Sequence, residues 1–292
     1  MPETVTHDPE AEAGSSTTEP RLARPVRKDE TVLHDRGLYV ERWLPERRSR
    51  RRPLLLIHGE LGGSWLWENY LSYFAQRGWE GHAINLRAHF WSDTADLASL
   101  DFWSYLDDVE AGLAALDRPA VLVGHGMGAL LAMKAAERMG AAGLVLLSPA
   151  LPQSVGPQAP SHVVRLVPPV FRRGLIGWDG ALGAIVARDA DLTLADVRRI
   201  QHLMGAESGA ARRQMLEGVP IDRAALGDIP TLVLGAGLDD RFPETESLAL
   251  AGWLGAEYQP FRGHSHFGLV VGEQSHEEVA DAVRAFLEAH RL

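Results

Sequence analysis

The chain has 292 residues, of which 46% are hydrophobic, and it carries a net charge of −10 with no cysteine. This composition is typical of a globular protein, leaves no thiol for a disulfide or a metal–thiolate site, and argues against general nucleic-acid binding. No apolar run of about 18 residues predicts a membrane span, and residues 1–20 are acidic rather than apolar, unlike a secretory signal, so we expect a cytoplasmic protein.

The first part of the chain changes from a polar tail to regular structure. Residues 1–28 are rich in Glu, Pro, Ser and Thr, which predicts a disordered tail ahead of a core that starts at residue 29. Residues 31–33 and 38–43 are strand-like, and Asp35-Arg36-Gly37 separates them. This pattern predicts a β-hairpin.

Apolar strands and amphipathic helices then alternate. Residues 54–57 are wholly apolar and end at His58-Gly59, and residues 83–87 (Ala-Ile-Asn-Leu-Arg) are a second strand-like run. Helical patterns follow each of these runs, at residues 67–76 and 101–116. The alternation predicts a mostly parallel sheet with crossover helices.

A tight turn joins a buried strand to a helix near the middle of the chain. The apolar residues 120–123 precede Gly124-His125-Gly126-Met127-Gly128, and a helical pattern continues to Gly140. Small residues at the first and last positions of this pentapeptide let strand and helix approach closely, which is the spacing of a nucleophile elbow. Its central position, which presents the nucleophile in such turns, holds Gly126 and therefore has no side chain.

The alternation is interrupted after the next strand. Residues 143–147 are an apolar strand that ends at Ser148, and residues 151–222 begin with a proline-rich stretch. Short helices are expected at residues 194–204 and 209–216. Apolar side chains in the first half of this segment are expected to face the core: Val163, Val164, Leu166, Val167, Val170, Phe171 and Leu175.

Strand and helix patterns return in the last part of the chain. Residues 229–234 and 258–261 are expected strands, and residues 275–292 form an amphipathic helix. Asp239 follows the first of these strands, and two histidines follow the second. The sequence thus predicts that the sheet is completed after the interruption.

In this order and at these spacings, the motifs resemble the α/β-hydrolase superfamily, and the likeness extends over most of the chain. The segments that carry it are residues 54–59, 124–128, 234–243 and 261–267. The resemblance implies an α/β-hydrolase fold, with a mostly parallel central sheet and helices on both faces. It also implies that the core, at residues 29–150 and 223–292, is interrupted by a helical lid at residues 151–222.

The same resemblance implies an acid–base pair. Asp239 lies four residues before Pro243 and matches the position of the family's acid. His266 fits a His-x-x-Leu form of the family's histidine motif, and His264, in a Gly-His pair, is the alternative base.

Further residues are expected around this pair. The backbone N–H groups of Glu60 and Met127 would form an oxyanion hole, and Trp65, His89 and Ser148 would contribute to substrate binding. The Glu60 side chain has two interpretations, an acid or base in the pocket and a carboxylate that faces solvent. Ser148 is also considered as a displaced nucleophile, with a structural serine as the alternative.

The vacant elbow position leaves three functional hypotheses. In the first, His266 and Asp239 act as a non-covalent acid/base pair on a small, largely apolar substrate, by water activation, elimination or cyclisation. In the second, the chain is an ordinary serine esterase or lipase-type hydrolase whose nucleophile has been substituted. In the third it is a non-catalytic ligand-binding homologue, because glycine relieves the backbone strain that a nucleophile must tolerate. All three predict a small-molecule partner, and the absence of metal-ligand or dinucleotide motifs predicts no metal and no cofactor.

Overall fold

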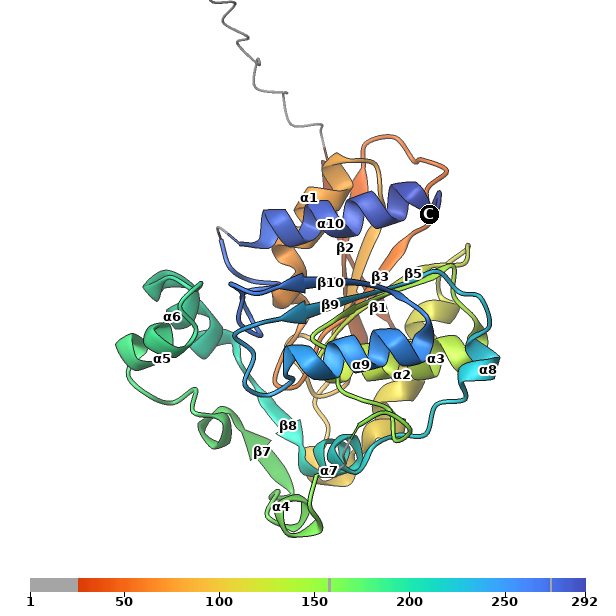
Figure 1. Ribbon diagram of the computed structural model, residues 1–292. Coiled ribbons are helices and arrows are strands. Elements are labelled where there is room, and N and C mark those ends of the chain that lie inside the picture. Colours follow the sequence, from red (N-terminus) through yellow and green to blue (C-terminus); the bar gives the residue numbers. More distant parts are fainter. Residues whose placement is uncertain (1–25, 157–158, 274) are drawn as a thin grey trace, which may run out of the picture.

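The computed structural model describes residues 26–156, 159–273 and 275–292. Within these residues, eight strands form one sheet in the order β1-β2-β4-β3-β5-β6-β9-β10 (Figure 1). The strands are β1 Val26–Leu33, β2 Leu38–Pro45, β3 Leu54–Ile57, β4 Gly81–Ile84, β5 Val121–His125, β6 Gly143–Leu147, β9 Thr231–Ala236 and β10 Glu257–Phe261.

Most of the sheet is parallel. β2 pairs antiparallel with both β1 and β4, whereas every pairing from β4 to β10 is parallel. The inner strands are buried on both faces, which explains why they read as continuous apolar runs rather than as alternating patterns. The predicted fold class is confirmed.

The N-terminal hairpin is longer than predicted. β1 begins at Val26, which pairs with Pro45, so residues 26–28 belong to a strand and not to the expected tail. Backbone pairing with β2 along its whole length holds residues 26–28 in a strand, although Arg27 and Lys28 do not have side chains typical of strands. The rest of the expected tail, residues 1–25, lies outside the described residues.

Helices cover both faces of the sheet, as Figure 1 shows. One face carries α1 and α10, and the other carries α2, α3 and α9. Alternate side chains of one strand enter the two layers, since Leu54 and Leu56 pack on the α1 side and Leu55 and Ile57 on the α2 side. The five helices are α1 Glu68–Gln76, α2 Phe102–Ala114, α3 Met127–Met139, α9 Glu244–Leu254 and α10 His276–Ala289.

The chain between β6 and β9 leaves the sheet. Its elements are α4 Ser161–Arg165, β7 Val170–Arg172, α5 Leu182–Arg188, α6 Leu194–Leu203, β8 Ala206–Ser208, α7 Gly209–Glu217 and α8 Arg223–Leu226. We call residues 151–222 the insertion. The two helices predicted in it are present as α6 and α7, but the small antiparallel sheet of β7 and β8 was not predicted.

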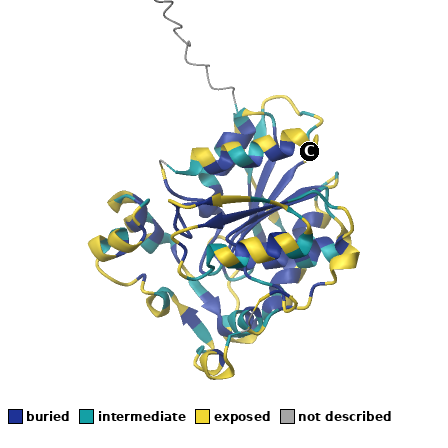
Figure 2. Cartoon of the chain, viewed as in Figure 1, coloured by how far each residue is buried: buried dark blue, intermediate teal, exposed yellow. Residues whose placement is uncertain are grey.

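The expected apolar underside of the insertion is only partly buried. Val164 and Phe171 are buried, whereas Leu166 is 79% exposed and Leu175 is 61% exposed. The prediction was wrong for these exposed side chains because α4 and β7 each bury only one residue, and the short 3-10 helix Arg173–Ile176, which contains Leu175, buries none. Figure 2 shows the same contrast between the buried sheet and the exposed outer helices of the insertion.

Candidate functional site

The site is organised around Gly126, the residue between β5 and α3. Its backbone is in a left-handed region, with φ +56° and ψ −119°. Its N–H donates to the carbonyl oxygen of Leu147 (3.1 Å), and its own carbonyl accepts from the N–H of Ala150 (3.0 Å). Gly128 allows α3 to meet the sheet at this point, because a Cβ there would overlap the carbonyl oxygens of β3's last residue and His58. The predicted tight turn is thus present, with a vacant central position.

Asp239 and His266 come together beside this turn. Nδ1 of His266 lies 2.6 Å from Oδ2 of Asp239, and both side chains are buried. The other oxygen of Asp239 accepts from the backbone N–H groups of Arg241 (2.9 Å) and Phe242 (3.0 Å), which fixes the carboxylate. His264 instead faces Ser275, with Nε2 3.4 Å from its carbonyl oxygen, and makes no contact with the acid.

The imidazole of His266 faces the vacant position. A Cβ added to Gly126 would lie 3.4 Å from Nε2 and 3.3 Å from Cε1 of His266. The ring is held between those of His125, with centroids 4.0 Å apart, and Phe242, at 5.1 Å. No hydrogen bond joins Nε2 to any residue that the structure describes, so this nitrogen can serve a ligand.

The surroundings set the protonation state of the pair. Burial lowers the pKa of His266 below its ordinary value of 6.5, against the opposing charge of Asp239. Burial alone would raise the pKa of Asp239, but the charge and hydrogen bond of His266 outweigh it and the pKa falls below 3.8. At neutral pH the imidazole is therefore neutral. Since Asp239 accepts from Nδ1–H, the lone pair is on Nε2, as a general base requires.

Two backbone donors border the same space. Neither the N–H of Glu60 nor that of Met127 donates to another described residue. The loop that carries Glu60 packs directly on the turn, because a Cβ on Gly59 would lie 2.8 Å from the carbonyl oxygen of His125. Met127 is also the first residue of α3, so its N–H lies at the positive end of the helix dipole. Both N–H groups are therefore free to donate to a ligand.

The side chain of Glu60 is bound by the insertion. Nη1 of Arg212, in α7, lies 2.6 Å and 2.5 Å from its two carboxylate oxygens. The guanidinium of Arg212 also covers the ring of Phe171, 4.1 Å from its centroid. Glu60 is therefore not a solvent-facing carboxylate, and the ion pair leaves neither of its oxygens free of Arg212. This pairing does not favour a role in proton transfer.

A buried polar network links the insertion to the core. The carboxylate of Glu207, in β8, accepts from the hydroxyl of Tyr105 (2.6 Å) and the backbone N–H of Leu61 (3.2 Å), and Nε2 of His89 lies 3.2 Å away. The Glu207 charge raises the pKa of His89 although burial opposes it, and the pKa of Glu207 is lowered in turn. His89, expected to bind substrate, is thus already held by Glu207, with Nδ1 on the carbonyl oxygen of Arg87.

The other expected substrate-binding residues are buried. Trp65 is in the apolar core on the α1 side, and Ser148 is fully buried at the end of β6 with φ +39°. The Ser148 hydroxyl has no hydrogen-bond partner among the described residues. Among the described residues no hydrogen bond joins this hydroxyl to His266, so the geometry offers no support for a displaced nucleophile.

Sequence reasoning did not identify three charged residues near the site. Glu207 and Arg212 are in the insertion, where no periodic pattern points inward, and Arg241 lies between the acid and Pro243 in no recognisable motif. For Glu207 the one available signal is an acidic residue between two small residues, Ala206 and Ser208.

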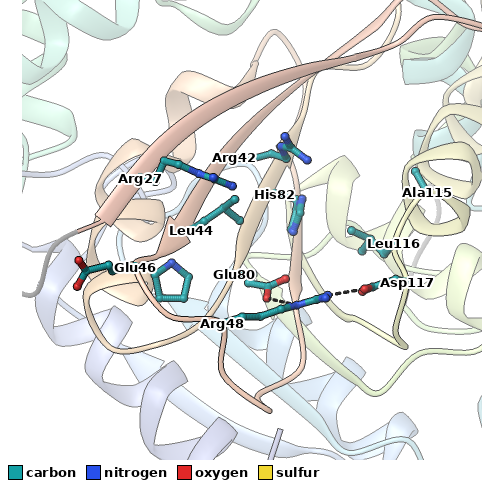
Figure 3. A pocket seen from close by; sticks show the side chains of 11 residues that line it. Arg27, Arg42, Leu44, Glu46, Arg48, Glu80, His82, Ala115, Leu116 and Asp117 are labelled. Atoms are coloured by element: carbon teal, nitrogen blue, oxygen red, sulfur yellow. Dashed lines mark hydrogen bonds and ion pairs between the residues drawn. The ribbon is translucent and has the colours of Figure 1, made fainter.

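A separate hollow of about 590 Å³ lies away from this site, near the N-terminal ends of β4 and β5 (Figure 3). Its charged side chains largely neutralise one another, as Arg48 binds both Glu80 and Asp117. His82 lines it, and burial lowers the pKa of this histidine to about 4. The hollow has no acid–base pair comparable to Asp239 and His266.

Two further properties concern metals and membranes. Within the described ranges, no group of three or more His, Asp or Glu side chains is arranged to hold a metal ion. Nor does any helix in these ranges have the length and apolar character needed to cross a membrane.

Comparisons with known proteins identify the family to which this chain belongs. Residues 54–282 match the model of a family described as “Alpha/beta hydrolase family”. No protein of curated function matches the sequence.

Three solved structures illustrate the shared fold. A bromoperoxidase from Bacillus anthracis has a TM-score of 0.68 at 15% identity, over 90% of this chain and 100% of that one. A thermophilic esterase from Thermogutta terrifontis, with malate bound, has 0.66 at 20%, over 91% and 100%. A monoacylglycerol lipase from Paleococcus ferrophilus has 0.65 at 19%, over 87% and 99%. At these identities the likeness establishes the fold alone.

Proposed function

Because the chain belongs to the alpha/beta hydrolase family, we propose that it is an enzyme that has kept the family's acid–base pair without its covalent step. His266 is the base and Asp239 orients it. The observation that carries the proposal is the 2.6 Å contact between Nδ1 of His266 and Asp239, with Nε2 directed at the empty position of Gly126. A ligand atom or water in that space would lie where a nucleophile's oxygen usually stands.

The chemistry follows from a neutral base beside an anion hole. His266 removes a proton from water or from the substrate, and the N–H groups of Glu60 and Met127 stabilise the negative charge that develops on an oxygen. General base catalysis contributes about 10²–10⁴-fold, and one oxyanion donor about 10²–10³-fold. These factors suffice for direct hydrolysis of an activated ester by water, for elimination or for cyclisation, but not for cleavage of an unactivated amide.

We infer a small substrate with a largely apolar body. The rings of Phe242 and Phe267 lie against His266, with centroids 5.1 Å and 5.2 Å from its own, and Trp178 of the insertion packs on Phe267. The insertion would act as a lid that excludes water from the base. An apolar, closed surrounding strengthens the electrostatic interactions on which such catalysis depends.

A second function, a serine hydrolase whose nucleophile has been substituted, has one observation in its favour. The Cβ position at Gly126 lies 3.4 Å from Nε2 of His266, so a serine there would have its base in reach. The native protein would then be inactive toward esters, and Gly126→Ser would restore hydrolysis.

The test compares the native protein with His266→Ala and Gly126→Ser. Each is given a panel of aryl esters and a panel of β-substituted ketones, which undergo elimination when a proton is removed. Native turnover on either panel that falls at least about 100-fold in His266→Ala supports the proposal. Turnover by Gly126→Ser alone supports the substituted hydrolase. A native protein that is inert on both panels, with an equally inert Gly126→Ser, would favour a non-catalytic binder.

A further inference from the structure

Among the described residues, Arg241 is a partly buried cation without an anionic partner of its own. It lies two residues after Asp239, and its guanidinium carbon is 4.8 Å from the ring centroid of Phe267, the neighbour of His266. Within the described part of the chain, its guanidinium makes no hydrogen bond and no ion pair. Burial, the largest influence, lowers the pKa of Arg241. A guanidinium that is partly withdrawn from water ordinarily has a carboxylate or a carbonyl to bind.

Four carboxylates, those of Asp239, Glu60, Asp189 and Asp240, influence Arg241 through their charges. Three of them have another partner, and the pairs are Asp239 with His266, Glu60 with Arg212, and Asp189 with Arg188. The fourth, Asp240, is the next residue in the chain and is exposed to solvent. The protein therefore supplies negative charge near Arg241 but leaves the guanidinium N–H groups unfilled.

The position of Arg241 relates it to the proposed reaction site. The charges of Arg241 and Glu60 both act on His266, in opposite directions. The guanidinium thus lies within electrostatic range of the base and of the loop that carries one anion-hole donor. Both groups also contact Phe267, whose ring centroid lies 4.8 Å from the guanidinium carbon and 5.2 Å from the centroid of the His266 imidazole.

We propose that Arg241 binds a carboxylate of the substrate and so selects small organic acids with an apolar body. The planar guanidinium matches a carboxylate in two parallel hydrogen bonds. A single unpaired cation among four carboxylates favours a monoanion over a phosphate dianion, which those carboxylates would repel more strongly. That a second group of this substrate reacts at His266 rests on the function proposed above. The binding of its carboxylate by Arg241 does not.

The test is a binding measurement with matched acids and amides. Isothermal titration calorimetry gives the dissociation constants of 4-phenylbutanoate and octanoate, and of their primary amides, for the native protein and for Arg241→Gln. The native protein is expected to bind at least one acid about tenfold or more tightly than its amide. Arg241→Gln is expected to lose this preference while its affinity for the amide is unchanged.

Three further variants make the result specific. Arg262→Gln removes an exposed arginine at the end of β10 and is expected to behave as the native protein. Arg241→Lys keeps a cation near Phe267 and replaces Arg241→Gln in the test if that variant does not fold. It is expected to bind the acid several-fold less tightly than the native protein does. His266→Ala should retain the preference for the acid, which separates this inference from the catalytic proposal.

Two results would overturn the inference. One is that no acid in the set binds the native protein more tightly than its amide. The other is that the acid preference persists in both Arg241→Gln and Arg241→Lys. Either result would stand whether or not the native protein shows turnover dependent on His266.

Discussion

His266 is the residue on which pH acts most directly. Because burial lowers its pKa below 6.5, the neutral base persists into mildly acidic solution. We expect kcat/KM of the native protein, for a substrate found by the panels above, to fall toward acid with an apparent pKa below 6.5. His264→Gln should keep the same acid limb, because His264 does not contact Asp239. An acid limb centred above 6.5, or one that moves in His264→Gln, would contradict the assignment of the base.

The residues of the pair could be predicted from sequence because each follows a strand of recognisable pattern. Asp239 and His266 belong to loops whose positions are set by β9 and β10, so the order of the strands brings them together. Arg241 could not be predicted in the same way, since its lack of a partner depends on where Glu60 and Asp189 find theirs. That is a property of the packed site and not of any local pattern.

At the scale of the elements, a buried carboxylate of β8, that of Glu207, is a main link between the insertion and the core. Glu207→Gln should lower the free energy of unfolding by about 3–5 kcal/mol, because it breaks a buried ion pair with His89. Chemical denaturation measures this. Glu68→Gln, at a half-exposed ion pair with Arg199, should cost at most about 1 kcal/mol.

The pH dependence of this loss has a definite sign. The lowered pKa of Glu207 contributes stability that is present above pH 4.5 and is lost as pH falls through the folded-state pKa. The raised pKa of His89 contributes stability that is present below pH 6.5 and is lost as pH rises through its folded-state pKa. The difference between native and Glu207→Gln should therefore be largest between pH 4.5 and 6.5. A difference that does not vary with pH would argue against an ion pair.

The approach of α3 to the sheet makes a second prediction at this scale. Gly128→Ala should destabilise the protein by about 1–3 kcal/mol or more, because the added methyl group meets backbone carbonyl oxygens that cannot move aside. Gly183→Ala is the matched control, since a Cβ there meets nothing within 4 Å in α5. Equal midpoints of denaturation for the two variants would show that the close approach is not required.

For the molecule as a whole, the core and the insertion differ in how far the sequence predicts them. The inner strands are buried on both faces, so their apolar runs and the helices between them predict the sheet. β7 and β8 have three residues each and alternate poorly, so their pairing depends on tertiary contacts that no local pattern records. For the same reason, hydrophobicity alone did not predict which apolar side chains of the insertion are buried.

This difference should extend to dynamics. In hydrogen exchange, the amides of α5 are expected to exchange faster than those of β6, because Ile185 is the only buried residue of α5 and every residue of β6 is buried. Protection of α5 equal to that of β6 would contradict a lid that is anchored through β8 and loosely packed elsewhere.

The central claim is that His266 acts without a covalent partner, and the most direct measurement is the intact mass of the protein after exposure to a fluorophosphonate. This reagent labels a serine only when a neighbouring base activates it. We predict that the native protein keeps its mass and that Gly126→Ser gains one adduct, at position 126, which is lost again when His266→Ala is added. An adduct on the native protein, for example at Ser148, would reveal another activated nucleophile and contradict the account. A Gly126→Ser variant that folds but stays unlabelled would show that His266 does not serve the position above Gly126.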